Sequence, residues 1–420
     1  MWPALRSATL ARSSGFFNRP SCRHYSAKAA SDPLRILFCG SDEFSCAALN
    51  ALNAEKKRNP GLIESLDVVV RPGKLAGRGM KKIREVPLKK LAEELNLPIH
   101  TRDTFTGWQP ESSINLIIAV SFGLFVPPRL LKLAKYGGLN VHPSLLPDFR
   151  GPAPLHHTLL QRRTHTGVTL QTLHPKSFDH GTVLAQTPLP GIPIPENCTT
   201  QDLHDIVTPL AAELLIDGLR RGVHVPPHKD VGWQPTDEEL RNLSHAPKLT
   251  KDDRKLKWGK MSAEDVVLRQ RVVGPVWCEA TRVSDGKKLR LILENVRLPE
   301  QPADIWRHVK KLFRSKWPAR DIFGRSRRTT ILCAEWSYKT IDVTIDSEKK
   351  CAEHATVPYL EERERDDSVL IPTYPEEGED VHIPVVLGGL LRVPTIKVEG
   401  STSKPALHAL KDFGRLPVGK

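Results

Sequence analysis

Short apolar runs and amphipathic stretches alternate along the first half of the chain. The runs 34–39 and 66–70 have the length and composition of buried strands, and the longer run 114–126 predicts a buried strand that breaks at Ser121-Phe122-Gly123. The stretches 86–95 and 203–219 repeat apolar residues at helical spacing. This alternation predicts a doubly wound, Rossmann-like α/β domain. No G-x-G-x-x-G follows the first strand, so a dinucleotide fingerprint is not indicated.

The pattern changes after about residue 220. Residues 226–250 contain Pro226, Pro227 and many polar residues, which favours a linker between a domain at 31–225 and another at 251–420. A short helix at 263–273 is followed by several short strands with turns, which predicts a small β-barrel. A terminal helix is expected near 405–413.

Two stretches have the composition of insertions into this second domain. Residues 304–328 hold nine basic residues and two acidic ones, interleaved with Trp306, Phe313 and Trp317. Such a segment can bind RNA through phosphates and stacking, or it can be a solvated helix docked by its aromatic residues, and both interpretations stay open. Residues 361–380 are acidic and predict a disordered surface loop.

The charge is concentrated partly at the N-terminus. The whole chain carries +14, and residues 1–30 contain no acid but five basic residues, namely Arg6, Arg12, Arg19, Arg23 and Lys28. Together with many serines and alanines, this composition predicts a mitochondrial presequence at 1–30, the alternative being a merely basic tail. Taking those five charges from +14 leaves +9, which suits a polyanionic partner.

Cysteine and histidine spacing indicates neither a disulfide framework nor a metal site. The seven cysteines form no C-x-x-C pair, and the sixteen histidines form no H-E-x-x-H. Reduced thiols in a reducing compartment such as the mitochondrial matrix are therefore expected. No apolar run is long enough to span a bilayer, so no membrane partner is expected.

The candidate chemistry lies in residues 137–151. Asn140 and His142 end a predicted strand that Pro143 terminates, and strand alternation places both side chains on one face. Open parallel sheets bind ligands at such strand ends. A carboxamide there can hold a developing oxyanion, and an imidazole can move the proton of an attacking amine.

A carboxylate to orient the imidazole is expected from the next strand. Residues 167–173 predict that strand, and it leads to a turn with Asp179 shortly before Gly181. Asn140, His142 and Asp179 have no serine or cysteine nucleophile between them. We therefore expect direct acyl transfer to an amine, without a covalent enzyme intermediate. Histidines 156, 165, 174 and 180 are interpreted as surface or structural residues.

Four motifs in this order resemble the formyltransferases that use 10-formyltetrahydrofolate: Asn140-x-His142, the stretch 144–151, residues 166–169, and Phe178-Asp-x-Gly181. Within that superfamily, the chain is most similar to the methionyl-tRNA formyltransferases of mitochondrial type. The resemblance covers most of 34–290 and implies an OB-like barrel in the C-terminal domain.

The resemblance also implies roles for particular residues. Asn140, His142 and Asp179 would be catalytic, and no metal is required. The folate donor would be bound by Ser121, Phe122, Gly123, Ser144, Leu145, Leu146 and Pro147. A glycine-rich basic loop at 71–82 would reach the tRNA, and the tRNA-binding residues would be Lys74, Arg78, Lys81, Lys82 and Arg150.

The reaction implied is transfer of a formyl group from 10-formyltetrahydrofolate to the α-amine of initiator methionyl-tRNA, by a monomer, in mitochondrial translation initiation. Three alternatives remain: a formyltransferase acting on a ribonucleotide or an amino sugar, a folate hydrolase, and an RNA-binding module with an inactive enzyme domain. The intact Asn140, His142 and Asp179 argue against the last.

Overall fold

The computed structural model describes residues 31–77, 79, 81–299, 374–375, 380–385 and 389–413. Several sequence predictions lie outside these residues: the presequence at 1–30, Arg78, the basic insertion 304–328, and most of the acidic segment 361–380. No helix of the described part of the chain is long and apolar enough to cross a membrane.

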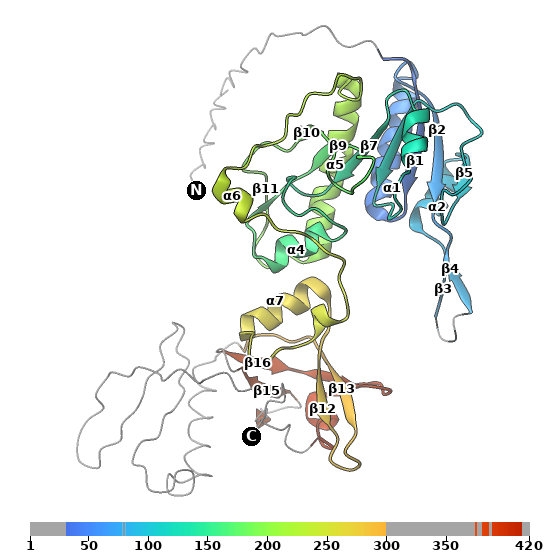
Figure 1. The fold of residues 1–420 in the computed structure, drawn as a ribbon. Coiled ribbons are helices and arrows are strands. Elements are labelled where there is room, and N and C mark those ends of the chain that lie inside the picture. Colours follow the sequence, from blue (N-terminus) through green and yellow to red (C-terminus); the bar gives the residue numbers. More distant parts are fainter. Residues whose placement is uncertain are drawn as a thin grey trace, which may run out of the picture.

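The N-terminal domain is built on one seven-stranded sheet, in the order β10-β9-β7-β6-β1-β2-β5 (Figure 1). All neighbours from β5 to β7 are parallel, whereas β9 and β10 are antiparallel to their neighbours. The predicted Rossmann-like α/β domain is confirmed. The strands are β1 (Leu34–Gly40), β2 (Ile63–Val70), β5 (Ile99–Thr101), β6 (Leu116–Val120), β7 (Gly138–His142), β9 (Thr169–Thr172) and β10 (Val183–Gln186).

Helices cover both faces of this sheet. α1 (Glu43–Arg58) and α5 (Thr200–Arg221) pack against each other and share the larger core cluster with α2 (Pro87–Glu94). α3 (Pro128–Leu133) packs on the opposite face in a smaller cluster. A capping box at Thr199 starts α5, and Gly222 in the left-handed region ends it. The predicted helices at 86–95 and 203–219 are confirmed within a few residues.

The central predicted strand ends where the sequence analysis placed its break. The run 114–126 forms β6 only from Leu116 to Val120. Ser121 has φ +47° and Gly123 has φ +73°, and neither conformation continues a strand. The rest of the run remains apolar because Phe122 and Val126 pack into the cluster around α3. The predicted break of the strand at 121–123 is confirmed.

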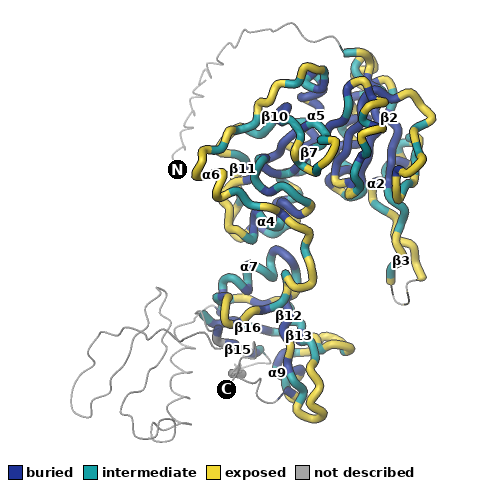
Figure 2. The backbone as a smooth tube through the Cα atoms, viewed as in Figure 1, coloured by how far each residue is buried: buried dark blue, intermediate teal, exposed yellow. Residues whose placement is uncertain are grey.

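The C-terminal domain has its own hydrophobic core, which includes Leu256, Val276, Leu291, Val393 and Phe413 (Figure 2). It contains α7 (Ala263–Val273) and short antiparallel strands in two sheets, ordered β12-β13-β17-β18 and β14-β15-β16. The strands are β12 (Val276–Thr281), β13 (Lys288–Glu294), β14 (Tyr374–Pro375), β15 (Val381–Pro384), β16 (Leu390–Val393), β17 (Thr395–Val398) and β18 (Ser403–Pro405), followed by α9 (Ala406–Ala409).

Smaller elements surround the main sheet. α7 packs against α4 (Pro154–Leu160) and α5, so it lies between the two domains (Figure 1). The predicted linker 226–250 contains a short helix, α6 (Asp237–Arg241), and its Val231 N–H donates to the carbonyl of Val183 in β10. The remaining elements are the ribbon of β3 (Lys74–Ala76) and β4 (Lys82–Arg84), the pair β8 (His165–Thr166) and β11 (Ile192–Pro193), and the 3-10 turn η2 (Asp252–Arg254).

Candidate functional site

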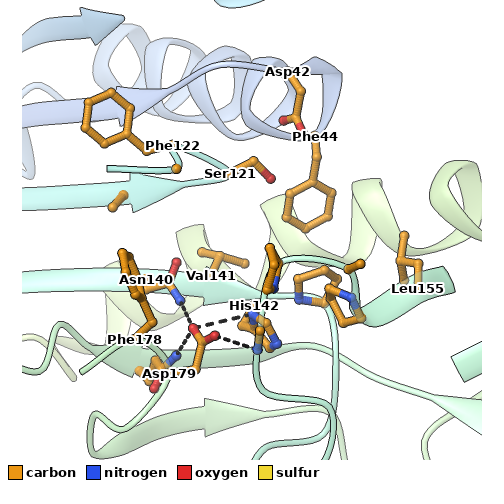
Figure 3. Close-up of a pocket in the computed structure, with 18 of the residues that line it drawn as sticks. Asp42, Phe44, Ser121, Phe122, Asn140, Val141, His142, Leu155, Phe178 and Asp179 are labelled. Atoms are coloured by element: carbon orange, nitrogen blue, oxygen red, sulfur yellow. Dashed lines mark hydrogen bonds and ion pairs between the residues drawn. The ribbon is translucent and has the colours of Figure 1, made fainter. Parts of the chain in front are cut away.

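A pocket of about 840 Å³ opens at the carboxyl ends of β1, β6 and β7 (Figure 3). These three strands are parallel neighbours, so the segments that follow them meet at one edge of the sheet. Asp42 and Phe44 follow β1, Ser121 follows β6, and Asn140 and His142 end β7. The pocket therefore forms here because β1, β6 and β7 are neighbours in the sheet.

Asn140 and His142 project into this pocket beside Asp179 (Figure 3). Asn140 Nδ2 donates to Asp179 Oδ1 at 3.2 Å, and His142 Nδ1 lies 3.6 Å from the same oxygen. The side chains of His142 and Asp179 are both buried, at 7% and 9% exposure. The structure thus brings together the three residues that the sequence analysis grouped as catalytic.

The turn that carries Asp179 is tightly built. Asp179 has φ +57°, a conformation that a short polar side chain tolerates better than most. Its Oδ2 accepts from Gly151 N at 3.0 Å, and its carbonyl accepts from Arg150 Nε at 2.9 Å. A Cβ at Gly181 would lie 1.7 Å from the Thr172 carbonyl oxygen, so only glycine permits this close approach to β9. These contacts fix the carboxylate toward His142.

A backbone carbonyl fixes the other side of the imidazole. His142 Nε2 lies 2.9 Å from the carbonyl oxygen of Phe149. Because that oxygen only accepts, this contact requires a proton on Nε2. In the neutral ring, the free lone pair is then on Nδ1, the nitrogen that faces Asp179. A proton on Nδ1 would face the Asp179 carboxylate, which can stabilise an imidazolium formed during a reaction.

Gln171 is a site residue that the sequence analysis missed. It lies directly opposite Asn140 in the antiparallel pairing of β7 and β9. Its Nε2 donates to Asp179 Oδ1 at 3.2 Å, and its Oε1 accepts from Gly181 N at 3.0 Å. Gln171 therefore ties both ends of the Asp179 turn to the sheet. The signal in the sequence was a lone glutamine in an apolar strand, but its partner depends on the strand register.

The opposite wall of the pocket contains Asp42, Phe44 and the segment after β6. Burial raises the pKa of the Asp42 carboxyl above its usual range, although its hydrogen bonds to Ser45 and Ser121 offset part of the effect. The carboxylate also caps α1 by accepting from Ser45 N at 3.1 Å. Ser121, Phe122 and Gly123, predicted as folate-binding residues, all line the pocket.

The remaining predicted folate residues lie elsewhere. Ser144, Leu145, Leu146 and Pro147 are not among the residues that line the pocket. Ser144 Oγ donates to the Asp148 carbonyl at 2.7 Å, and Leu146 N donates to Thr169 Oγ1 at 3.1 Å. These bonds shape the turn after β7. A role of 144–147 in folate binding therefore stays a prediction.

The sequence analysis also did not identify several histidines as residues of the pocket. His156 and His174, interpreted there as surface or structural, line the pocket, as do His204 and His245. At its rim, Phe178 is 58% exposed, and its ring packs edge-on against Phe125, with centroids 5.3 Å apart. Within the described ranges, no three His, Cys, Asp or Glu side chains are grouped so as to hold a metal ion.

The residues predicted to contact tRNA fall in two places. Lys74 and Lys82 lie on the β3–β4 ribbon, which extends away from the sheet, and Lys81 lies just before β4 (Figure 1). All three lysines are exposed. Arg78, which lies between β3 and β4 in the sequence, is outside the described residues. Arg150 is instead in the pocket region, where its Nε is bonded to the Asp179 carbonyl.

Comparisons with known proteins agree with this geometry. Residues 34–219 match the family model described as formyl transferase. The mitochondrial methionyl-tRNA formyltransferase of Saccharomyces cerevisiae is 33% identical over 298 residues, which cover 61% of this chain and 72% of the yeast protein. The human mitochondrial methionyl-tRNA formyltransferase is 32% identical over 247 residues, which cover 58% of each chain.

The chain thus spans more than two thirds of the yeast relative and somewhat less of the human one. A solved sugar N-formyltransferase from a Shewanella species overlaps with a TM-score of 0.43 and is 15% identical, over 61% of this chain and 95% of that one. This likeness is too loose to support a functional argument. The assignment of the chain to a family therefore rests on the sequence relatives and the family model. The chain belongs to the methionyl-tRNA formyltransferase family.

Proposed function

We propose that this protein transfers the formyl group of 10-formyltetrahydrofolate to the α-amine of methionyl-tRNA. The main support for the proposal is that Asn140, His142 and Asp179 lie together at one edge of a pocket of about 840 Å³, in a chain of this family. No serine or cysteine stands between them as a nucleophile. The amine therefore attacks the formyl carbon directly.

Asn140 stabilises the oxygen that becomes negative in the tetrahedral intermediate. One N–H of its Nδ2 is bonded to Asp179 Oδ1, which fixes the amide and leaves the second N–H for the pocket. A pre-oriented donor of this kind does not reorganise as the charge develops. Removing one such donor typically costs about 10²–10³-fold in kcat.

His142 and Asp179 move the proton. As the new bond forms between the amine nitrogen and the formyl carbon, His142 Nδ1 accepts a proton from the amine. Asp179 stabilises the imidazolium from 3.6 Å, a separation that can tighten when substrates bind. The bond between the formyl carbon and N10 of the donor then breaks, and the same proton goes to N10. His142 returns to its neutral form, so protons and charges balance.

The folate donor fits the half of the pocket next to Ser121, Phe122 and Gly123. This segment lies at the end of a strand, and a Cβ at Gly123 would meet nothing within 4 Å, which leaves room for a ligand. Phe44, Phe122 and Val126 supply apolar surface for a flat ring system. Backbone groups of the segment supply polar partners.

The tRNA is bound outside the pocket. On the β3–β4 ribbon, the pairs Lys74–Arg84 and Ala76–Lys82 share one face, because cross-strand partners point the same way. This basic face suits the phosphates of an acceptor end, and Arg78, between the two strands in the sequence, would add a further charge. The C-terminal domain, proposed as an OB-like barrel, and Arg150 complete the tRNA-binding surface.

A location in the mitochondrial matrix, reached through the presequence 1–30, is part of the same proposal. It is supported by the basic, acid-free composition of that segment and by the mitochondrial relatives. The product would serve initiation of mitochondrial translation. We propose that the protein acts as a monomer.

The test is formyl transfer from radiolabelled 10-formyltetrahydrofolate to methionyl-tRNA, by protein that starts at Ser31, alongside His142→Ala. Label on the tRNA that is lost in the variant supports the reaction and the site. Label released to water would instead indicate a hydrolase. Binding of tRNA without turnover would favour an RNA-binding protein with an inactive enzyme domain.

A further inference from the structure

The segment 244–247, which lies between the two domains in the sequence, runs alongside the loop 148–151 in the catalytic domain. Phe149 N donates to the Ser244 carbonyl at 2.7 Å, and Ala246 N donates to the Arg150 carbonyl at 2.8 Å. Arg150 and His245 form a parallel β-bridge. The segment is therefore paired to the loop through a single β-bridge and its flanking hydrogen bonds, although its composition indicated a linker.

Further contacts make this pairing close. Ala246 is fully buried, and its carbonyl accepts from Ala153 N at 3.2 Å. A Cβ at Gly151 would lie 2.4 Å from that same carbonyl oxygen, so glycine is what permits the approach. Ser244 N donates to Asp148 Oδ1 at 2.7 Å. Backbone and side chain thus both hold 244–247 in place.

The other side of the same loop holds the proposed catalytic groups. The Phe149 carbonyl contacts His142 Nε2 at 2.9 Å, Arg150 Nε donates to the Asp179 carbonyl at 2.9 Å, and Gly151 N donates to Asp179 Oδ2 at 3.0 Å. Each of the residues 149–151 therefore contacts segment 244–247 on one side and a catalytic residue on the other.

We infer that segment 244–247 is a positioning segment of the catalytic centre, which aligns His142 and Asp179 through the loop 148–151. The inference rests on the proposed function and names residues that act through others. The segment also continues directly into the C-terminal domain, where the Lys251 carbonyl accepts from Trp277 Nε1 in β12 at 3.0 Å. The placement of the tRNA-binding domain and the alignment of the catalytic pair thus share one short stretch of chain.

Two matched pairs of variants in the full chain test this inference. Ala246→Pro removes the N–H that bonds Arg150, whereas Ala246→Gly keeps it. Asp148→Ala removes the acceptor of Ser244 N, whereas Asp148→Asn keeps an oxygen there and loses only the charge that faces Arg163. The second pair changes a side chain alone, so it remains informative if the proline variant does not fold.

We expect Ala246→Pro to lower kcat about 10- to 100-fold, because small misplacement of reacting groups costs rates of that order. KM for 10-formyltetrahydrofolate should stay within about twofold, because the folate wall at 121–123 is untouched. Asp148→Ala should lower kcat by a smaller factor, and Asp148→Asn should restore most of it. A variant that lengthens the tether, with Gly-Ser inserted after Pro247, should raise KM for methionyl-tRNA and keep kcat.

The outcomes separate this inference from the proposed function. Transfer by the unaltered protein tests the function alone. If the unaltered protein is active and Ala246→Pro and Asp148→Ala keep kcat, or change only KM for the tRNA, segment 244–247 is merely a tether and the inference is overturned. Equal loss of kcat in Asp148→Asn and Asp148→Ala would also overturn it, because the retained oxygen would then have no effect.

Discussion

Gln171 and Asp179 are joined by a hydrogen bond of 3.2 Å from Nε2 to Oδ1, and the orientation of the glutamine is set by its neighbour. Its Oε1 accepts from Gly181 N, so the amide nitrogen must face the carboxylate. Asp179 Oδ1 thereby receives donors from β9 and, through Asn140, from β7. Gln171 thus helps to orient the Asp179 carboxylate.

Replacing Gln171 should therefore impair turnover more than binding. In Gln171→Met, a side chain of similar length removes one donor to Asp179 and leaves the Gly181 N–H unpaired, a loss of about 1–3 kcal/mol. We expect kcat to fall about tenfold with both KM values nearly unchanged. Steady-state kinetics with each substrate varied in turn measures this.

Gln171→Glu provides the comparison. It keeps an acceptor for Gly181 N but places a second carboxylate against Asp179, so kcat should fall further than in Gln171→Met. Equal kcat in the two variants and the unaltered protein would show that Gln171 does not position Asp179.

Gly181→Ala tests the close approach of the Asp179 turn to β9. The added Cβ would meet the Thr172 carbonyl at 1.7 Å, so the turn must move. We expect a loss of about 2–4 kcal/mol in the free energy of unfolding and a fall in kcat of about 100-fold. Chemical denaturation and turnover measure the two effects.

Gly286→Ala is the control for this variant. Gly286 has φ +69° but open space around its Cβ position, so substitution should cost about 1 kcal/mol and leave kcat as it is. Similar kcat values in Gly181→Ala and Gly286→Ala would contradict the role of the turn.

The basic face of the β3–β4 ribbon should act on tRNA alone. Lys74→Ala and Lys82→Ala each remove one charge that faces phosphates, so KM for methionyl-tRNA should rise and the slope of binding against salt should decrease by about one for each lysine. KM for the folate donor should not change. Lys90→Ala, on α2, removes an 81% exposed lysine away from the ribbon and serves as control. An equal effect of Lys90→Ala would indicate general charge attraction.

Leu75 and Ile83 lie on the other face of the ribbon, 54% and 65% exposed and directly opposite each other. If the basic face alone binds tRNA, Leu75→Ser should leave KM for the tRNA within about twofold of the unaltered value. A larger rise would place the apolar face in the tRNA contact as well.

His224 should make the stability of the protein depend on pH. It is fully buried against Tyr136, and burial lowers its pKa to about 4. The folded state thus disfavours the proton that the unfolded chain takes up near pH 6.5. Stability from this group is complete above pH 6.5 and is lost as the pH falls toward 4, by up to about 3 kcal/mol.

His224→Phe keeps a ring against Tyr136 and removes the titration. Although it also loses the 2.9 Å contact of Nε2 with Ser31 Oγ, the variant should gain stability relative to the unaltered protein as the pH is lowered from 7 to 5. Thermal unfolding of both proteins over this range provides the measurement. Parallel curves would show that another group sets the pH dependence.

The sequence by itself determined the class of fold and the core of the site. Apolar runs and helical spacing identified the strands and helices of the N-terminal domain, because burial of a face imposes a period on the chain. Strand alternation paired Asn140 with His142 for the same reason. The candidate acid Asp179 followed from its turn, although its grouping with the other two also needed the family resemblance.

Only the tertiary structure decided which distant groups meet. Gln171 reaches Asp179 because of the register of β9 on β7, and Phe149 holds His142 through a carbonyl that every residue possesses. Ala246 joins the site by its backbone, through hydrogen bonds with Arg150 and Ala153. Sequence periodicity records which face a residue presents, whereas backbone hydrogen bonds between separate segments depend on packing and carry no residue signature.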